Sequence, residues 1–181
     1  MGHALIVGGT GMLSDVTVWL AKQGYSVSVI GRNKHRMDET IKKCPNSINH
    51  PILVDYSSLE ELESKLRDAV MHFRDIELVV VWVHSYAEEA ISILIATISE
   101  IARDYRLFHV LGSSADLQQW HRKLTDHQKY KYHQIQLGFI IDNERSRWLT
   151  NAEIASGVIE AITKQESVHI VGVTEPMNRK P

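Results

Sequence analysis

The sequence contains a single cysteine, Cys44. One cysteine excludes a disulfide within the chain and a cysteine-rich metal site, and we expect no bound metal. No apolar run approaches the length of a membrane span. No basic segment precedes the short apolar stretch near the start, so we expect no signal peptide. These absences together predict a cytoplasmic protein without a membrane partner.

The chain also has little net charge. Its formal net charge at pH 7 is −2 over 181 residues, so no global field attracts nucleic acid or an anionic membrane. Segment 118–134 mixes basic and aromatic side chains, a combination that can hold single-stranded nucleic acid, but it is short and contains Asp126. We therefore expect no nucleic-acid partner. A subunit contact through Trp120 and Tyr130 is the favoured alternative, which leaves a homodimer open.

Apolar runs and helical periodicities alternate along the chain. Buried strands are predicted at 4–7, 25–30, 52–54, 78–83, 107–111, 134–141 and 168–173. Pro51 is placed at the start of the third strand, where its missing N–H is tolerated. A capping box at Thr150 and Glu153 marks the start of the last helix. The alternation predicts an α/β protein, a doubly wound parallel sheet of about seven strands with helices on both faces.

We expect residues 1–175 to form one domain and 176–181 to be a frayed tail. The length is sufficient for a substantial core. No linker, repeat or low-complexity segment divides the chain.

Three glycines separate the first strand from the first helix. Gly8, Gly9 and Gly11 follow the apolar run and precede the amphipathic stretch. Read from Gly9, the pattern is G-x-G-x-x-S, with Ser14 in place of the third glycine of the dinucleotide fingerprint. Such a loop lets a pyrophosphate approach the backbone, and the helix N-terminus supplies N–H groups and partial positive charge. We expect a dinucleotide here; the alternative is a plain tight turn.

The second strand is followed by Arg32 where an NAD-binding chain carries an acidic residue for the ribose 2′-hydroxyl. A guanidinium suits a 2′-phosphate, because it can donate two charge-assisted hydrogen bonds. We therefore predict NADP(H) as the cofactor. Arg36 either joins this contact or belongs to a solvated basic helix start. Asp55, after the third strand, either accepts the adenine amino group or caps the next helix.

Together these residues resemble the short-chain dehydrogenase/reductase family, especially its atypical NADP-binding members. The resemblance rests on V-G-G-T-G-M-L at 7–13, G-R-N at 31–33, Asp55, the strand ending at His84, G-S-S-A at 112–115 and L-G-F-I at 137–140. It implies a Rossmann fold that binds NADP(H). The cofactor contacts that it implies are Gly8, Gly9, Thr10, Gly11, Met12, Leu13, Arg32, Asn33, Arg36, Asp55, Tyr56 and Val83.

The resemblance also implies where catalysis takes place. In the family, a serine near the end of the fifth strand orients the substrate carbonyl, and Ser113 and Ser114 occupy that place. His84 follows the neighbouring strand, so it also flanks the point where cofactor and substrate meet in an open α/β sheet. We assign these three residues as catalytic, with the unidentified substrate between them and the loop 142–148.

This sequence departs from the family pattern at the proton donor. It is usually a tyrosine with a lysine four residues later, and no Tyr-x-x-x-Lys occurs here. His127 and Lys131 have that spacing on a predicted short helix spanning 116–131; the alternative is a solvated surface helix. We predict an oxidoreductase that moves hydride between NADPH and a small carbonyl compound. A non-catalytic NADP(H) sensor is the alternative.

Overall fold

The structure is a computed structural model, which describes the chain except for residues 1, 71–75, 103, 126–128 and 144. In the described residues, seven strands form one parallel sheet in the order β3-β2-β1-β4-β5-β6-β9. They are β1 (His3–Val7), β2 (Ser26–Gly31), β3 (Ile48–Leu53), β4 (Ile76–Trp82), β5 (Tyr105–Leu111), β6 (Tyr130–Leu137) and β9 (Val168–Val171). The chain order reverses its direction between β1 and β4, which is where open α/β sheets bind ligands.

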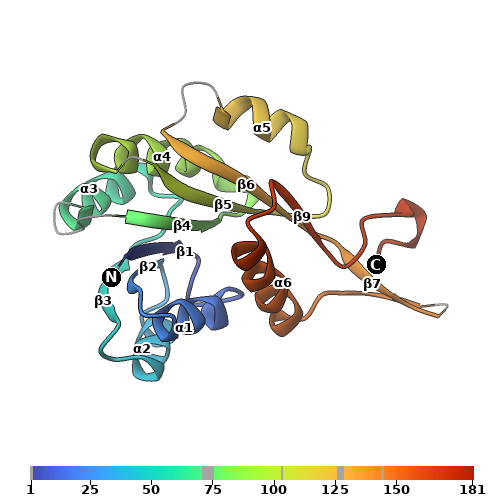
Figure 1. Ribbon diagram of the computed structural model, residues 1–181, viewed down its shortest axis with the longest axis horizontal. Helices are drawn as coiled ribbons and strands as arrows, with labels where there is room; N and C mark the ends of the chain where they lie inside the picture. The colour runs from blue at the N-terminus through green and yellow to red at the C-terminus, as the bar shows by residue number, and fades with distance from the viewer. Residues whose placement is uncertain (1, 71–75, 103, 126–128, 144) are drawn as a thin grey trace.

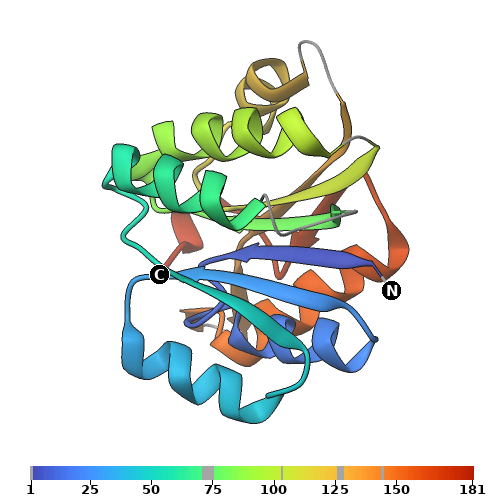
Figure 2. The same cartoon turned by 90° about the vertical axis from the view of Figure 1, so that its left-hand side faces the viewer.

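Helices cover both faces of this sheet (Figures 1 and 2). One face carries α1 (Ser14–Lys22), α2 (Lys34–Lys43) and α6 (Asn151–Lys164), and the other carries α3 (Leu59–Val70), α4 (Glu89–Ile101) and α5 (Leu117–Thr125). Side chains of β1 alternate between the two cores: Leu5 packs towards α3 and α4, whereas Ile6 packs towards α1 and α6. The predicted doubly wound α/β sheet is confirmed.

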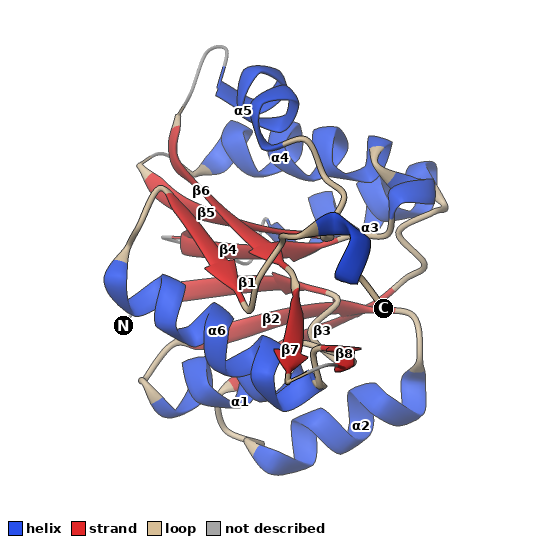
Figure 3. Ribbon diagram, turned by 90° about the vertical axis from the view of Figure 1, so that its right-hand side faces the viewer, coloured by secondary structure: helices blue, strands red, loops and turns tan. Residues whose placement is uncertain are grey.

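The predicted sixth strand, 134–141, is two strands. The sheet strand β6 ends at Leu137, and β7 (Phe139–Asp142) turns away to form an antiparallel hairpin with β8 (Arg145–Trp148). The break falls at Gly138, where a Cβ would lie 2.1 Å from the carbonyl oxygen of Val173, so this position requires glycine. The hairpin projects from the main sheet beside the C-terminal end of the chain (Figure 3).

Two other element boundaries differ from the sequence prediction. Strand β3 begins at Ile48, so Pro51 lies inside the strand and pairs with Val29. Proline is tolerated there because β3 is the edge of the sheet and needs no donor on its outer side. The long helix predicted at 87–103 begins with a separate 3-10 turn at Ser85–Ala87.

The start of α6 follows its prediction. Thr150 Oγ1 accepts a hydrogen bond from the Glu153 N–H at 3.2 Å, and a Glu153 carboxylate oxygen accepts one from the Thr150 N–H at 2.8 Å. Arg147, and then the Thr150 N–H and hydroxyl, which both donate to the Glu153 carboxylate, lower the pKa of Glu153 to about 2. The capping box is therefore confirmed. Among the described residues, no helix has both the length and the apolar character that a bilayer crossing requires.

Candidate functional site

The loops at the carboxyl ends of β1, β2 and β4 border a cavity of about 610 Å³, which we call the first cavity. It is lined by Gly8, Thr10, Gly11, Met12, Gly31, Arg32, Asn33, Arg36, Tyr56, Trp82 and His84. Most residues that the sequence assigned to the cofactor therefore lie around one space. That space opens at the reversal of strand order between β1 and β4.

The three glycines of the first loop have different reasons to be glycine. Gly8 has a φ of +78°, and a Cβ there would lie 3.0 Å from the backbone oxygen of Trp82. At Gly9 a Cβ would lie 2.7 Å from Thr17 Oγ1, the hydroxyl that donates to the Gly9 carbonyl. At Gly11, apart from its neighbours in the chain, a Cβ would have only Arg36 Nη1 within 4 Å among the described residues, at 3.9 Å. The turn and its packing account for Gly8 and Gly9, but they do not require Gly11, which borders the first cavity.

Two other residues of this loop, Thr10 and Leu13, have different surroundings: Thr10 lies at the first cavity and Leu13 in the core. Thr10 lines the first cavity and packs closely on Gly31, where a Cβ would come within 2.7 Å of Thr10 Oγ1. Leu13, also assigned to the cofactor, is fully buried among the side chains of α1, so its side chain belongs to the core. It is the N-cap residue of α1 and makes no side-chain hydrogen bond there.

Arg32 and Asp55 form an exposed ion pair at the edge of the first cavity. Arg32 Nη1 donates to Asp55 Oδ2 at 3.2 Å, and this bond raises the pKa of Arg32. The other carboxylate oxygen of Asp55 accepts hydrogen bonds from the Ser57 N–H and hydroxyl, at 3.0 and 2.8 Å. These two bonds, more than Arg32, lower the pKa of Asp55. Both residues are therefore charged at neutral pH, and Asp55 also supports the turn that precedes α3.

The two remaining candidates after β2 belong to the start of α2. Asn33 is the N-cap residue, and its Oδ1 accepts the Arg36 N–H at 3.0 Å. The Arg36 guanidinium lines the first cavity. Arg36 thus belongs to the basic start of α2 and also lines the first cavity, and its contact with a 2′-phosphate stays a prediction.

Aromatic side chains form one wall of the first cavity. The Trp82 and His84 rings meet edge to face with centroids 5.6 Å apart, and Tyr86 stacks on His84 at 5.4 Å. Burial, and then a hydrogen bond with Tyr86, raises the pKa of Tyr56 to about 12. Sequence reasoning missed Trp82, which lines both cavities, because Trp82 ends an apolar strand. It also missed Tyr86, which lies outside the lining and contacts it through His84.

A second cavity, of about 500 Å³, lies between the ends of β4 and β5 and the starts of α4 and α5. Its lining includes the three residues predicted to be catalytic, His84, Ser113 and Ser114, together with Val83. Trp82 and His84 line both cavities, so the two spaces adjoin there. Gln136 on β6 holds the serine loop by donating to the backbone oxygens of Ser113 (3.4 Å) and Ala115 (3.2 Å).

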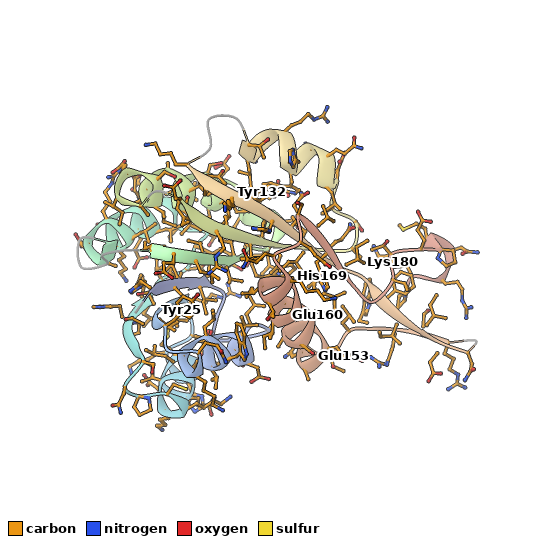
Figure 4. The ribbon with its side chains drawn as sticks, in the orientation of Figure 1. Tyr25, Tyr132, Glu153, Glu160, His169 and Lys180 are labelled. Carbon is orange, nitrogen blue, oxygen red and sulfur yellow. The ribbon has the colours of Figure 1, made fainter. Side chains whose placement is uncertain are left out.

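His109, Trp120 and Lys123 also line the second cavity, and sequence reasoning did not assign them to the site. His109 is 1% exposed, and its Nδ1 shares a 2.9 Å hydrogen bond with the Tyr132 hydroxyl on β6, beneath α5 (Figure 4). Its ring meets Trp120 edge to face at 4.7 Å, and Lys123 Nζ lies 4.7 Å from the Trp120 ring centre. Burial, and then the charge of Lys123, lowers the pKa of His109 to about 3, so the ring is neutral at physiological pH.

The predicted helix over 116–131 is shorter than expected. It ends at Thr125, and Lys131 lies in β6, so Lys131 cannot occupy a helical position one turn after His127. His127 itself lies outside the described residues. The lysine that faces the site is Lys123, one helical turn after Gln119, which lines the same cavity. Gln119 and Lys123 are four residues apart and therefore lie on the same face of a helix. This spacing is the sequence signal that could have identified them as residues of the second cavity.

Trp120 and Tyr130 were the predicted subunit contact. Trp120 is 8% exposed and belongs to the core on the α3–α4–α5 face. Tyr130 packs against the same core, and its hydroxyl donates to the Leu124 carbonyl. The Trp120 ring is therefore largely buried within the chain, and the subunit contact stays a prediction.

No family model matches the sequence, and no curated protein matches it. Solved structures do match. A Brucella melitensis short-chain dehydrogenase/reductase has a TM-score of 0.71 and 14% identity over 94% of each chain. A Sphingobium yanoikuyae short-chain dehydrogenase, in complex with NADPH, has a TM-score of 0.69 and 13% identity over 94% of this chain and 87% of that one.

A Serratia marcescens short-chain dehydrogenase/reductase double mutant has a TM-score of 0.75 and 12% identity, covering 96% of this chain and 98% of that one. At these identities the likeness concerns the fold alone. The site is therefore described from the residues of this chain rather than transferred from its neighbours. In its fold, the chain is a Rossmann protein like the short-chain dehydrogenases/reductases.

Proposed function

We propose that the protein binds NADP(H) along the first cavity and transfers hydride between this cofactor and a small carbonyl compound in the second cavity. The observation that supports this proposal is the contact between the two cavities at Trp82 and His84. A cofactor that follows the glycine loop in the first cavity can reach a substrate in the second only through such a junction. The structural likeness to a dehydrogenase in complex with NADPH supports the same choice of cofactor.

The residues around the first cavity suit the parts of this cofactor. Gly11 leaves space for a pyrophosphate beside the N-terminus of α1, where the helix dipole favours negative charge. Arg32 and Arg36 supply guanidinium groups for the 2′-phosphate. Trp82, His84 and Tyr56 offer aromatic surface for the rings of the cofactor.

Arg32→Ala is expected to weaken NADPH binding about ten- to a hundred-fold and to leave NADH binding nearly unchanged. The reason is the loss of charge-assisted hydrogen bonds to the 2′-phosphate, which only NADPH carries. Titration calorimetry with both cofactors measures the two affinities. Lys34→Ala is the control, because Lys34 pairs with Asp38 and lies outside the lining of the first cavity. Equal losses for the two cofactors would contradict the assignment of Arg32.

The chemistry requires a group that donates a hydrogen bond or a proton to the carbonyl oxygen. When bound, NADPH supplies the hydride. Lys180 Nζ donates to Ser114 Oγ at 2.5 Å, so the hydroxyl hydrogen of Ser114 is left to point elsewhere. Ser114 lines the second cavity and can therefore donate to a substrate oxygen there. His84, at the junction of the two cavities, is the second candidate donor.

Ser114→Ala is expected to lower NADPH-dependent carbonyl reduction at least about a hundred-fold, the scale of general acid catalysis. Its NADPH affinity should stay unchanged, because Ser114 lines only the second cavity. His84→Ala should lower the activity to a similar extent. The assay follows NADPH oxidation with a panel of aldehydes, ketones and quinones, and Ser156→Ala on the exposed face of α6 is the control. Full activity in both Ser114→Ala and His84→Ala would contradict these roles.

A protein that binds NADP(H) without chemistry is the second candidate. It is favoured by the sequence, which contains no Tyr-x-x-x-Lys. Tight NADPH binding together with no oxidation above background for every compound of the panel would favour this sensor function over the reductase.

A further inference from the structure

The end of the chain brings a cation to the second cavity. The short turn η2 (Met177–Arg179) precedes Lys180, whose ammonium donates to the cavity-lining hydroxyl of Ser114 and lies 5.6 Å from the Trp148 ring centre. Arg179 Nη2 donates to the backbone oxygen of Asn143 at 2.9 Å, which ties the same segment to the β7–β8 hairpin. Figure 4 shows Lys180 beside this hairpin. The segment predicted as a frayed tail therefore has defined partners at the site.

Lys180 and Lys123 have similar surroundings. Each ammonium lies over a tryptophan ring, Trp148 for Lys180 and Trp120 for Lys123. Within the part of the chain that the structure describes, neither forms an ion pair with a carboxylate. Lysines on other helices do pair with an acidic residue one turn away, as at Lys34, Lys65 and Lys164. Lys123, which lines the second cavity, and Lys180, which contacts the lining hydroxyl of Ser114, thus retain positive charge that an anionic ligand can use.

Two carboxylates, of Glu88 and Asp116, also line the second cavity. Each lies at the N-terminus of a helix, where the partial positive charge of the helix balances it. Asp116 Oδ1 accepts the Gln119 N–H at 2.9 Å at the start of α5, and Glu88 directly precedes α4. Among the described residues, neither acid forms an ion pair with Lys123 or Lys180.

We propose that the substrate of the second cavity is a carbonyl compound that carries a carboxylate, and that Lys180 binds this carboxylate. The proposal rests on the proposed reductase function and specifies its substrate class. Ser114 presents a hydroxyl donor because Lys180 already donates to its oxygen, and Lys180 has further N–H groups to offer. An ammonium and a hydroxyl side by side form a donor pair that matches a carboxylate or a carboxylate next to a carbonyl.

The test compares two probes that differ in charge, 4-formylbenzoate and its methyl ester. Titration calorimetry measures their binding to the full chain, both alone and saturated with NADP⁺, so that no reduction occurs. Wild type should bind the acid about ten-fold more tightly than the ester, the lower end expected for a charge-assisted contact that is open to solvent. Lys180→Gln should remove this preference, because an amide can still donate to Ser114 but carries no charge.

Two further variants test whether the preference for the acid depends on the positive charge at position 180. One keeps that charge, and the other removes the charge of a distant lysine. Lys180→Arg should keep most of the preference for the acid, whereas Lys22→Ala, on the exposed end of α1, should keep all of it. Equal binding of acid and ester by wild type would overturn the proposal, and so would an equal loss for both probes in Lys180→Gln. The NADP⁺ titration tests cofactor binding separately. If NADP⁺ does not bind, the proposed function is contradicted, whereas the acid–ester comparison without cofactor still tests the role of Lys180.

Discussion

Gly11→Val is expected to abolish NADPH binding while the protein stays folded. The valine side chain would occupy space at the border of the first cavity, where the pyrophosphate must approach the backbone. The fold should tolerate it. In the part of the chain that the structure describes, and apart from the neighbours of Gly11 in sequence, a Cβ there would have only Arg36 Nη1 within 4 Å, at the end of a flexible side chain. Titration calorimetry with NADPH measures binding, and thermal unfolding measures stability.

Thr163→Val is the matched control for this variant. It places a valine on the exposed face of α6, away from both cavities, so it should bind NADPH as wild type does. If Gly11→Val still binds NADPH with wild-type affinity, the glycine loop is only a turn. If Gly11→Val unfolds, the loop contributes to the core, contrary to the contacts around Gly11.

The fold could be predicted from the sequence because its signals are local and repeated. Each buried strand is a short apolar run, and the capping box at Thr150 marks a helix start that the structure confirms. The errors occur where contacts distant in sequence decide the conformation. Strand β6 ends next to Gly138, where the backbone of Val173 packs closely and Phe139 bonds to Val173. No local sequence pattern around Gly138 predicts this contact with a distant segment.

The residues around the first cavity were easier to predict from the sequence than those around the second cavity. Arg32 and the glycines follow strand ends at positions set by the order of the sheet, so counting along the chain finds them. The walls of the second cavity come from distant segments. His109 lies inside an apolar strand, Lys123 lies on a helix whose length was overestimated, and Lys180 comes from the end of the chain.

The free energy of unfolding is expected to fall by about 2 kcal/mol between pH 7 and pH 5 because of His109 alone. Burial, and then the charge of Lys123, lowers the pKa of this ring from 6.5 to about 3. Below pH 6.5 the unfolded chain therefore binds a proton that the folded protein does not bind until about pH 3. Stability is lost as the pH falls through this window, by up to about 1.4 kcal/mol per pH unit. His3, with a pKa of about 4, adds a loss of the same sign.

His109→Gln isolates this contribution. The amide can still share a hydrogen bond with the Tyr132 hydroxyl but does not titrate. The free energy of unfolding of the variant should therefore fall by about 2 kcal/mol less than that of wild type between pH 7 and pH 5. Urea unfolding at the two pH values measures the difference, and the interval stays above the usual pKa of most carboxylates. Gln118→Ala, on the exposed face of α5, removes no titratable group and should show the pH dependence of wild type. An unchanged pH dependence in His109→Gln would mean that the ring is protonated inside the folded protein, beside the ammonium of Lys123.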